Sequence, residues 1–384
     1  MAQIVQWQAN LEASPCLTEV MDALAKGLLI GLPTETVYGV AGNAFLGTSI
    51  ERIQSSKART EGKPLTIAVP DYQRARECVP DMTALGRRLA QRGWPGPLTI
   101  VFQAGLNGGL LERLPDPVRR RVCPDGTLGL RVPDHPVARE ILTRSPAPLV
   151  LTSANRAGEP PAVSSEQVVQ SIGEELAFVI DGGPRPLGVP STVVGVTDNE
   201  WRVLREGAMS RAELAEKAAC RILFVCTGNT CRSPMAAALC KKLLAEQLHC
   251  DLHGLIERGF FVHSAGITAM MGLTAAPEAV QAVSELGADL RQHQSQPLTE
   301  ELLEQADYVI IMTRGHLYSL LAEFGSLGPA PRLLSRAGVD LADPIGCEQS
   351  VYRDCAAQIE RDLQELIPEI LRTCAQEPAG NRGQ

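Results

Sequence analysis

The sequence predicts two α/β domains, and three observations support this. The chain has 384 residues, whereas one domain typically takes about 100–200. Apolar runs of strand length alternate with helical patterns along most of its length, which is typical of α/β folds. The character of the sequence also changes near Met209, where a short polar segment begins. We therefore expect domains at 1–208 and 221–374, a linker at 209–220 and a disordered polar tail at 375–384.

In the first half, Gly- and Pro-rich turns separate short β-type runs, with helical patterns between them. The expected strands are 27–32, 65–69, 98–102, 148–152 and 191–196. The expected helices are 50–56, 82–92 and 136–143.

The second half alternates more regularly. Its expected strands are 221–226, 260–264, 307–312 and 331–335, and its expected helices are 233–248, 275–286, 299–305 and 351–372. This alternation predicts a parallel α/β sandwich whose ligand loop follows the carboxyl end of the first strand.

Composition narrows the class of protein. The 45% apolar content is ordinary for a globular protein. No stretch approaches the ~20 apolar residues of a membrane span, and no export signal is visible at the N-terminus, so we expect a cytoplasmic protein without membrane contact. The eleven cysteines show no disulfide-framework spacing and are expected to be reduced.

Charge is uneven along the chain. Residues 51–150 carry 16 basic and 10 acidic side chains, although residues 1–210 as a whole hold 21 and 22. This basic stretch suits a polyanionic substrate such as a nucleotide triphosphate. A solvated basic face is the alternative.

The most informative motif runs from Cys226 to Arg232, between the apolar run 222–225 and a Ser-Pro helix start. Backbone N–H groups of such a loop, together with the helix N-terminus, form an anion cradle. Arg232 adds a planar fork suited to two phosphate oxygens. The same positive field favours a Cys226 thiolate, to which Ser233 can donate a hydrogen bond.

The supporting loop residues have distinct expected roles. Gly228 and Asn229 tolerate the left-handed backbone that converging N–H groups require. Cys231 either forms a reversible disulfide with Cys226 or packs beneath the loop. Phosphate-ester or phosphoramidate cleavage also needs a general acid, and Asp343, in an Asp-Pro turn, is the candidate.

These residues resemble the low-molecular-weight protein phosphatases over 221–372. The further segments in family order are His263–Gly266, Ala306-Asp307, Ile311–Thr313 and Asp343-Pro344. The resemblance implies a flavodoxin-like parallel sheet, with Cys226 as nucleophile, Arg232 as transition-state clamp and Asp343 as acid and then base. It implies no cofactor, and a phosphoprotein as substrate.

Two positions bear on the substrate. Tyrosine phosphatases of this family usually have a bulky aliphatic residue where this chain has Thr230, which instead resembles the protein-arginine-phosphatase branch. They also tend to have an aromatic residue where this chain has Ile345, and the loss of an aromatic wall weakens stacking on a phenyl ring. We therefore expect phosphoarginine, with phosphotyrosine as the alternative, although Ile345 also departs from the arginine branch.

The first half lacks a catalytic thiol or histidine arrangement. Its informative residues are cations and small hydroxyl or amide donors, a set suited to holding a triphosphate and aligning reactants. Such residues are Lys57, Arg59, Lys63, Thr127, Arg131, Ser153, Asn155, Ser191 and Arg205, with Thr34 and Thr36.

Taken together these segments resemble the threonylcarbamoyl-AMP synthases from about residue 15 to 208. The matching segments are Leu32–Gly39, Lys57–Arg59, Lys63–Leu65, Trp94–Thr99, Leu130–Pro133, Ser153–Asn155, Asp181–Gly183, Ser191–Val193 and Leu204-Arg205. The resemblance implies a twisted, mostly parallel open α/β sheet with a concave basic face. One departure is Ala68, where some long-form members have a histidine.

The resemblance also implies a reaction and its site. L-threonine, bicarbonate and ATP would give threonylcarbamoyl-AMP and pyrophosphate, for a transferase that modifies tRNA adenosine 37. Threonine would be held by Thr36, Arg131 and Ser191. ATP would be held by Lys57, Arg59, Lys63, Thr127, Ser153, Asn155 and Arg205, with Mg²⁺ bridging its phosphates and no metal ligand from protein side chains.

The sequence therefore predicts a bifunctional enzyme, a nucleotidyltransferase followed by a cysteine-dependent phosphatase. For the first half, a non-catalytic RNA- or nucleotide-binding module stays open as an alternative, because a basic concave face suits that role as well.

Overall fold

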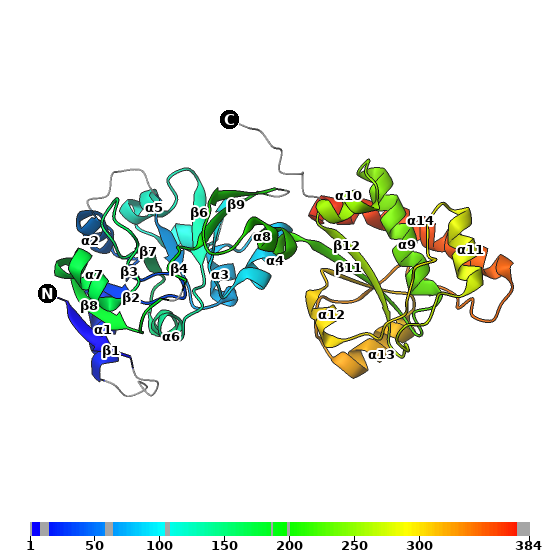
Figure 1. The fold of residues 1–384 in the computed structure, drawn as a ribbon, viewed down its shortest axis with the longest axis horizontal. Helices are drawn as coiled ribbons and strands as arrows, with labels where there is room; N and C mark the ends of the chain where they lie inside the picture. The colour runs from blue at the N-terminus through cyan, green and yellow to red at the C-terminus, as the bar shows by residue number, and fades with distance from the viewer. Residues whose placement is uncertain are drawn as a thin grey trace. The chain divides into compact units, whose positions relative to one another are not determined.

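The computed structural model describes residues 2–7, 15–57, 64–103, 108–185, 187–197 and 200–374. It divides into two compact units, one of residues 1–218 and one beginning at Ala219 (Figure 1). Each has its own sheet and cores. The predicted tail at 375–384 lies outside the described residues.

The first unit is built on a ten-stranded sheet. In spatial order its strands are β1 (Gln3–Gln6), β8 (Leu176–Asp181), β2 (Leu29–Leu32), β3 (Gly39–Asn43), β7 (Leu149–Ser153), β4 (Thr66–Ala68), β6 (Thr127–Arg131), β5 (Leu98–Gln103), β9 (Thr192–Val196) and β10 (Trp201–Arg205). Four neighbouring pairs are parallel and five are antiparallel. The predicted α/β class is confirmed, but the sheet is mixed rather than mostly parallel.

Four of the five antiparallel pairs involve a strand that the sequence pattern did not reveal, β3, β6 or β10. β3 and β6 contain glycines and lack a continuous apolar run, yet both are internal strands. A Cβ at Gly39 would lie 2.6 Å from Leu151 Cδ1, so a side chain there would collide with the neighbouring strand. Insertion of β3 between β2 and β7 makes both of its pairings antiparallel.

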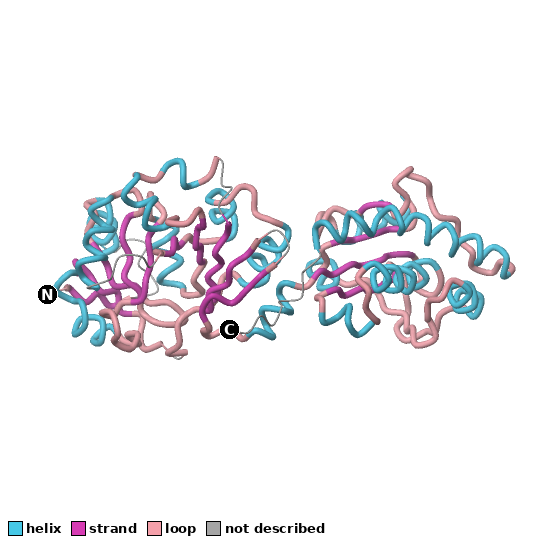
Figure 2. Tube along the Cα trace, turned by 90° about the horizontal axis from the view of Figure 1, so that it is seen from above, coloured by secondary structure: helices cyan, strands magenta, loops and turns pink. Residues whose placement is uncertain are grey.

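Helices cover both faces of this sheet, as Figure 2 shows. They are α1 (Pro15–Ala25), α2 (Gly47–Lys57), α3 (Tyr72–Cys78), α4 (Ala84–Gly93), α5 (Asp116–Val122), α6 (Pro136–Arg144), α7 (Ser165–Ile172) and α8 (Arg211–Ala218), with 3-10 turns η2 (Leu110–Arg113) and η3 (Gly173–Glu175). α1 and α6 enclose one core, while α2, α4, α5, α7 and α8 contribute to the larger one.

The segment predicted as a linker, 209–220, is instead part of the folded units. Its helix α8 buries Leu214 and Ala218 in the first core. The helix is held to α4 by reciprocal contacts, because Arg92 donates to the Lys217 carbonyl at 3.1 Å and Lys217 Nζ donates to the Arg92 carbonyl at 2.8 Å. The polar sequence of α8 concealed this packing, because only two of its positions face the core.

The second unit is a four-stranded parallel sheet in the order β12 (Phe260–Gly266), β11 (Cys220–Cys226), β13 (Tyr308–Ile311) and β14 (Arg332–Leu333). Its helices are α9 (Arg232–Gln247), α10 (Leu252–Glu257), α11 (Pro277–Glu285), α12 (Glu300–Gln305), α13 (Arg314–Phe324) and α14 (Gln349–Cys374). The predicted parallel sandwich is confirmed. α10 and α13 were not predicted.

Two cores enclose this parallel sheet. Ile222 and Phe224 of β11 face α9, α11 and α14, whereas Leu223 and Val225 face α12 and α13 (Figure 1). Both faces of β11 are thus buried, which explains its continuous apolar run. The strand ends at Cys226, so its last residue opens the loop that leads to α9.

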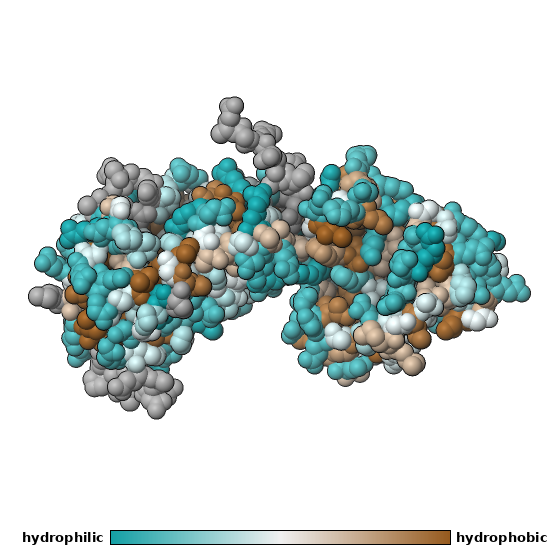
Figure 3. All heavy atoms as spheres, in the orientation of Figure 1, coloured by the Kyte–Doolittle hydropathy of each residue, from teal (hydrophilic) through white to brown (hydrophobic). Residues whose placement is uncertain are grey.

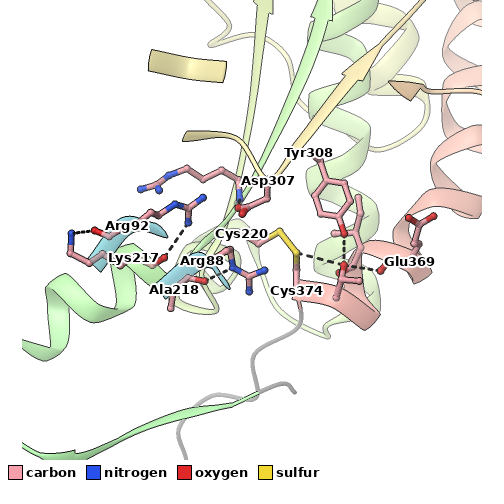
Figure 4. The surroundings of a disulfide bond; sticks show 12 residues. Arg88, Arg92, Lys217, Ala218, Cys220, Asp307, Tyr308, Glu369 and Cys374 are labelled. Atoms are coloured by element: carbon pink, nitrogen blue, oxygen red, sulfur yellow. Dashed lines mark hydrogen bonds between the residues drawn. A yellow bond between two sulfur atoms is a disulfide. The ribbon is translucent and has the colours of Figure 1, made fainter. Parts of the chain in front are cut away.

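A disulfide joins Cys220, the first residue of β11, to Cys374, the last residue of α14, with their Cα atoms 5.8 Å apart (Figure 4). The prediction of reduced cysteines is therefore wrong for this pair. A separation of 154 residues leaves no local spacing from which the pairing could be read. The eight other cysteines described in this chain are free.

The surface in Figure 3 mixes hydrophilic and hydrophobic residues in both units. Among the described residues, no helix is long and apolar enough to span a bilayer.

The connection from β10 to α8 crosses the start of β9 at close range. Met209 N donates to Thr192 Oγ1 at 3.0 Å, and Ala208 N donates to the Pro190 carbonyl at 2.9 Å. A Cβ at Gly207 would overlap the backbone of Ser191 and Thr192. Only glycine therefore fits where the chain passes over this strand.

We expect Gly207→Ala to lower the free energy of unfolding of the first unit by about 1–3 kcal/mol, because overlap with fixed backbone forces it to move. Tryptophan fluorescence during denaturant unfolding measures this selectively, since Trp7, Trp94 and Trp201 all lie in that unit. Gly47→Ala is the matched control, because its Cβ would meet only Pro117 at 3.9 Å in a helix that favours alanine. Equal unfolding midpoints for the two variants would show that a Cβ at position 207 does not destabilise the first unit.

Candidate active sites

A cavity of about 770 Å³ lies in the first unit. The predicted residues that line it are Thr127, Arg131, Ser153, Ser191 and Arg205. Thr127 begins β6 and Arg131 ends it, while Ser153, Ser191 and Arg205 lie at the ends of β7, β9 and β10. Strand ends far apart in the sequence thus bring hydroxyls and guanidiniums to one cavity.

Arg131 is the most constrained cation of this cavity. Its side chain is 8% exposed and donates to Glu35 Oε1 and to Thr36 Oγ1, each at 2.8 Å. Thr36 Oγ1 lies 2.9 Å from Thr34 Oγ1. The buried Nε of Arg131 has no partner among the described residues. The predicted threonine-binding residues Thr36 and Arg131 are therefore in direct contact.

Arg205 approaches the same cavity from β10. It donates to the Ser191 carbonyl at 2.7 Å and to Ser191 Oγ at 3.3 Å, and that hydroxyl also bonds Thr99 Oγ1 at 2.9 Å. Arg205 is exposed as a whole residue, but partial desolvation of its guanidinium, and then the charge of Arg131, lower its pKa. The charge of Arg131 thus disfavours the charge of Arg205, and an anion bound between or beside the two guanidiniums would relieve this repulsion.

Lys57 and Asn155 lie next to the end of β7. Lys57 is buried at the end of α2, and its Nζ donates to Ser153 Oγ at 3.2 Å as well as to the Ser153 carbonyl. Asn155 Nδ2 donates to the Glu159 carbonyl at 2.7 Å, which leaves Asn155 Oδ1 buried and without a described partner. Neither residue lines the cavity, although both contact or flank Ser153, which does. Arg59 and Lys63 lie outside the described residues.

Arg185 and Tyr38 support this site, and the sequence alone predicted no role for either side chain. Arg185 stacks 5.6 Å above the Tyr38 ring and donates to the Thr34 carbonyl at 3.2 Å. Tyr38 donates to the Gly183 carbonyl at 2.8 Å, and burial raises the pKa of Tyr38 to about 12. Glu35, which pairs with Arg131, belongs to the same Leu32–Gly39 segment as Thr36. The segment was recognised, but which of its side chains point inward could not be read from it.

In the second unit, the predicted nucleophile Cys226 and clamp Arg232 are brought to one loop. Cys226 is the last residue of β11 and Arg232 is the first of α9, and both are buried. Cys226 Sγ lies 2.9 Å from Ser233 Oγ. Because this loop precedes a 16-residue helix, its N–H groups add to the positive end of the helix dipole.

Asn229 holds the loop in shape. It has a left-handed backbone with φ of 56°, and its Nδ2 donates to Ser233 Oγ and Ser264 Oγ, each at 2.9 Å. Its Oδ1 accepts from Gln296 N at 3.0 Å. The left-handed conformation expected at Gly228 is not found, since Asn229 alone makes the turn within this loop.

Asp343 and Arg232 form an ion pair, with Asp343 Oδ2 2.5 Å from an Arg232 nitrogen. The Arg232 side chain is 7% exposed, whereas that of Asp343 is 43% exposed. The predicted acid therefore lies at the mouth of the loop and faces solvent. A phosphate group that binds the Arg232 fork would compete with this carboxylate.

Cys231 packs beneath the loop. It is buried, with Sγ 3.5 Å from the Tyr352 hydroxyl and 3.7 Å from Thr230 Oγ1. Burial and the bond to Cys231 raise the pKa of Tyr352. Both Cys226 and Cys231 are free thiols in this structure.

His135 is a buried histidine of the first unit, and its pKa predicts how the stability of that unit depends on pH. Burial, and then the charge of Arg185, lower the pKa of His135 to about 4, against about 6.5 in an unfolded chain. The folded state therefore favours the neutral ring. Its contribution to stability is present above pH 6.5 and is lost as the pH falls through 4.

We expect the free energy of unfolding of the first unit to fall with pH in this window by at most about 1.4 kcal/mol per pH unit from this group. His135→Gln should remove that part of the slope, and tryptophan fluorescence at several pH values measures it. His135 is the only histidine among residues 1–218. An unchanged slope in the variant would show that the ring is not the group that titrates.

Comparisons with known proteins place each half of the chain. Residues 22–207 match a family model for the Sua5, YciO and YrdC proteins, described as telomere recombination. A putative threonylcarbamoyl-AMP synthase of Mycobacterium tuberculosis is 34% identical over 200 residues, which are 52% of this chain and 88% of that protein. A solved structure of a Pyrococcus abyssi Sua5 variant has a TM-score of 0.50 at 22% identity over 81% of this chain and 99% of that one, a likeness of fold.

Residues 221–376 match the family model for low molecular weight phosphotyrosine protein phosphatases. A protein-arginine-phosphatase of Bacillus subtilis is 37% identical over 153 residues, which are 39% of this chain and 95% of that protein.

Among the relatives of the first half, the Bacillus subtilis threonylcarbamoyl-AMP synthase is 29% identical over 52% of this chain. The matched residues are only 56% of that protein, so this chain spans about half of its length. The chain therefore belongs to two families fused in one polypeptide, the threonylcarbamoyl-AMP synthases in its first half and the low-molecular-weight protein phosphatases in its second.

Proposed function

We propose that the protein is a bifunctional enzyme that makes threonylcarbamoyl-AMP in its first unit and dephosphorylates phosphoarginine in its second. The observation that supports the first activity is the cavity in which Arg131 and Arg205 meet without a nucleophilic thiol or a histidine. The observation that supports the second is Cys226 in the loop that Arg232 and Asp343 close.

The cavity suits a reaction that needs positioning and charge stabilisation. Its volume of about 770 Å³ is within the usual range for small-molecule sites. The guanidinium of Arg131, which lines the cavity beside Thr36, would bind the carboxylate of L-threonine. Arg205, with Ser153 and Thr127, would bind the phosphates of ATP, and Lys57 would hold Ser153 in position.

The synthase reaction can proceed without a covalent bond between the enzyme and a substrate. The threonine amine and bicarbonate lose water to give a carbamate, whose oxygen attacks the α-phosphorus of ATP. The bond from that phosphorus to the β-phosphate bridging oxygen breaks, and pyrophosphate leaves. The product would pass to a transferase that modifies tRNA adenosine 37.

Mg²⁺ would accompany ATP and neutralise charge on the leaving pyrophosphate. Among the described residues, no three His, Cys, Asp or Glu side chains converge as metal ligands, so the ion would be held through the phosphates. Asp125 and Glu200 are acidic residues on the cavity wall that could approach it or its waters. Because L-threonine, bicarbonate, ATP and tRNA all occur in the cytoplasm, we propose that the enzyme acts there.

The synthase proposal predicts pyrophosphate release that requires L-threonine, bicarbonate and ATP together. We expect Arg131→Gln to lower kcat/KM for threonine by about 10- to 100-fold, since charge-assisted hydrogen bonds typically contribute about 1.5–3 kcal/mol. Arg74→Gln is the control, because Arg74 is an exposed arginine of the same unit. RNA binding without threonine-dependent pyrophosphate release would instead support a binding module.

The phosphatase reaction would proceed in two steps. Cys226 Sγ attacks phosphorus, the P–N bond to the arginine side chain breaks, and protonated Asp343 gives its proton to the leaving nitrogen. Asp343 then takes a proton from water as the water attacks phosphorus, and the P–S bond breaks to release phosphate and the thiolate. Arg232 and the loop N–H groups bind the equatorial oxygens throughout.

Three features support phosphoarginine as the substrate. The related Bacillus subtilis protein is named as a protein-arginine-phosphatase. Thr230 and Ile345, the latter 65% exposed, offer no aromatic surface on which a phenyl ring could stack. Asp343 pairs with the guanidinium of Arg232, and its carboxylate, once it has given up its proton in the first step, could pair with the departing arginine guanidinium in the same way.

Phosphoarginine and phosphotyrosine peptides of one sequence, assayed side by side, test this proposal. We expect faster turnover of phosphoarginine, no turnover of either by Cys226→Ser, and a shift toward phosphotyrosine in Thr230→Ile. Cys250→Ser is the control, because Cys250 is a free thiol that follows α9 at its far end from the loop. Faster phosphotyrosine turnover would refute the arginine assignment, and activity in Cys226→Ser would refute the nucleophile.

A further inference from the structure

His316 is a buried histidine that neither proposed mechanism uses. It lies in the first turn of α13, directly after β13, and is 6% exposed. Its Nδ1 is 2.9 Å from Thr313 Oγ1, and its Nε2 is 3.0 Å from Thr227 Oγ1. Thr227 is the loop residue next to Cys226, so the ring reaches from a helix into the phosphate loop.

The ring is not needed to cap its own helix. Thr313 is the N-cap of α13, and its Oγ1 accepts from the backbone N–H of His316 at 3.2 Å. The capping bond would therefore exist with another side chain at 316. The imidazole adds a hydrogen bond to Thr227, which lies 89 positions away in the sequence.

Thr227 is held from two sides. Its carbonyl accepts from Thr268 N at 3.1 Å, in the segment that follows β12, while its hydroxyl bonds the imidazole from α13. The preceding carbonyl, of Cys226, accepts from Ile267 N at 2.9 Å. The bond to His316 thus ties the Thr227 side chain to the β13 side of the sheet.

The charged groups that act on this ring are Arg232, Asp343 and Asp340. Burial, and then the charge of Arg232, lower the pKa of His316 to about 4, so the ring is neutral at neutral pH. In either neutral tautomer one ring nitrogen donates and the other accepts, and each threonine hydroxyl can take the complementary role. The ring therefore positions Thr227 without adding a charge that would compete with Arg232.

We propose that His316 is a positioning residue of the phosphatase site, which fixes the start of the phosphate loop through the Thr227 hydroxyl. The inference rests on the proposed phosphatase function. Because the loop N–H groups must converge on the oxygens of the transition state, a loop that is free to shift at Thr227 loses kcat more than substrate affinity.

A double-mutant cycle in the full chain tests whether the ring acts through Thr227. With p-nitrophenyl phosphate as the probe, we expect His316→Phe and Thr227→Val each to lower kcat about tenfold, with KM changed less than threefold. The double variant should also lose about tenfold rather than a hundredfold, because both substitutions remove the same bond. His316→Gln, whose amide can still reach Thr227, should recover most of the rate.

The controls separate positioning from folding. His253→Phe alters an exposed histidine of the same unit and should leave kcat unchanged. Thr227→Val keeps the buried ring, so it tests the bond even if His316→Phe unfolds. Wild-type kcat in Thr227→Val, or losses that multiply to a hundredfold in the double variant, would overturn the role of His316. A wild-type chain with no phosphatase activity would overturn the proposed function itself.

Discussion

Each site is built around a buried guanidinium that forms an ion pair with a carboxylate. Arg131 and Arg232 have side chains that are 8% and 7% exposed, and each is paired with a carboxylate of its own unit, Glu35 and Asp343. Such pairs rarely add much stability, because desolvation offsets most of the attraction. Their value is that each guanidinium is kept charged and oriented for an anionic substrate that can bind in place of, or beside, the carboxylate.

The two units differ in what surrounds the guanidinium. In the second, the parallel pairing of β11 with β12 and β13 delivers Cys226 to the loop, and Asn229 binds Ser233, Ser264 and Gln296 to hold it. In the first, a mixed sheet brings hydroxyls and a second guanidinium to one cavity. The same recognition of phosphate thus supports covalent chemistry in one case and alignment of reactants in the other.

Much of the architecture was predictable from the sequence because burial leaves a pattern. The run before Cys226 predicted β11, and the apolar spacing at 351–372 predicted α14. β3 and β6 were missed because glycines interrupt their apolar residues, and in β3 a close neighbour, Leu151, requires the glycine at position 39. Arg131 and Cys226 belong to recognisable segments. In contrast, Glu35, His316 and the bond between Cys220 and Cys374 depend on contacts that only the folded chain makes.

The bond between Cys220 and Cys374 has a topological consequence. It joins the first residue of β11 to the last residue of α14, so the elements between them form a covalent ring of polypeptide. While the bond is intact, a single cut in any loop of this ring opens the chain but releases no fragment, and both pieces remain attached. The ring also limits how far the ends of the unfolded segment can separate, which lowers the conformational entropy gained on unfolding. If the disulfide is reduced, no covalent bond joins the two pieces that the same cut produces.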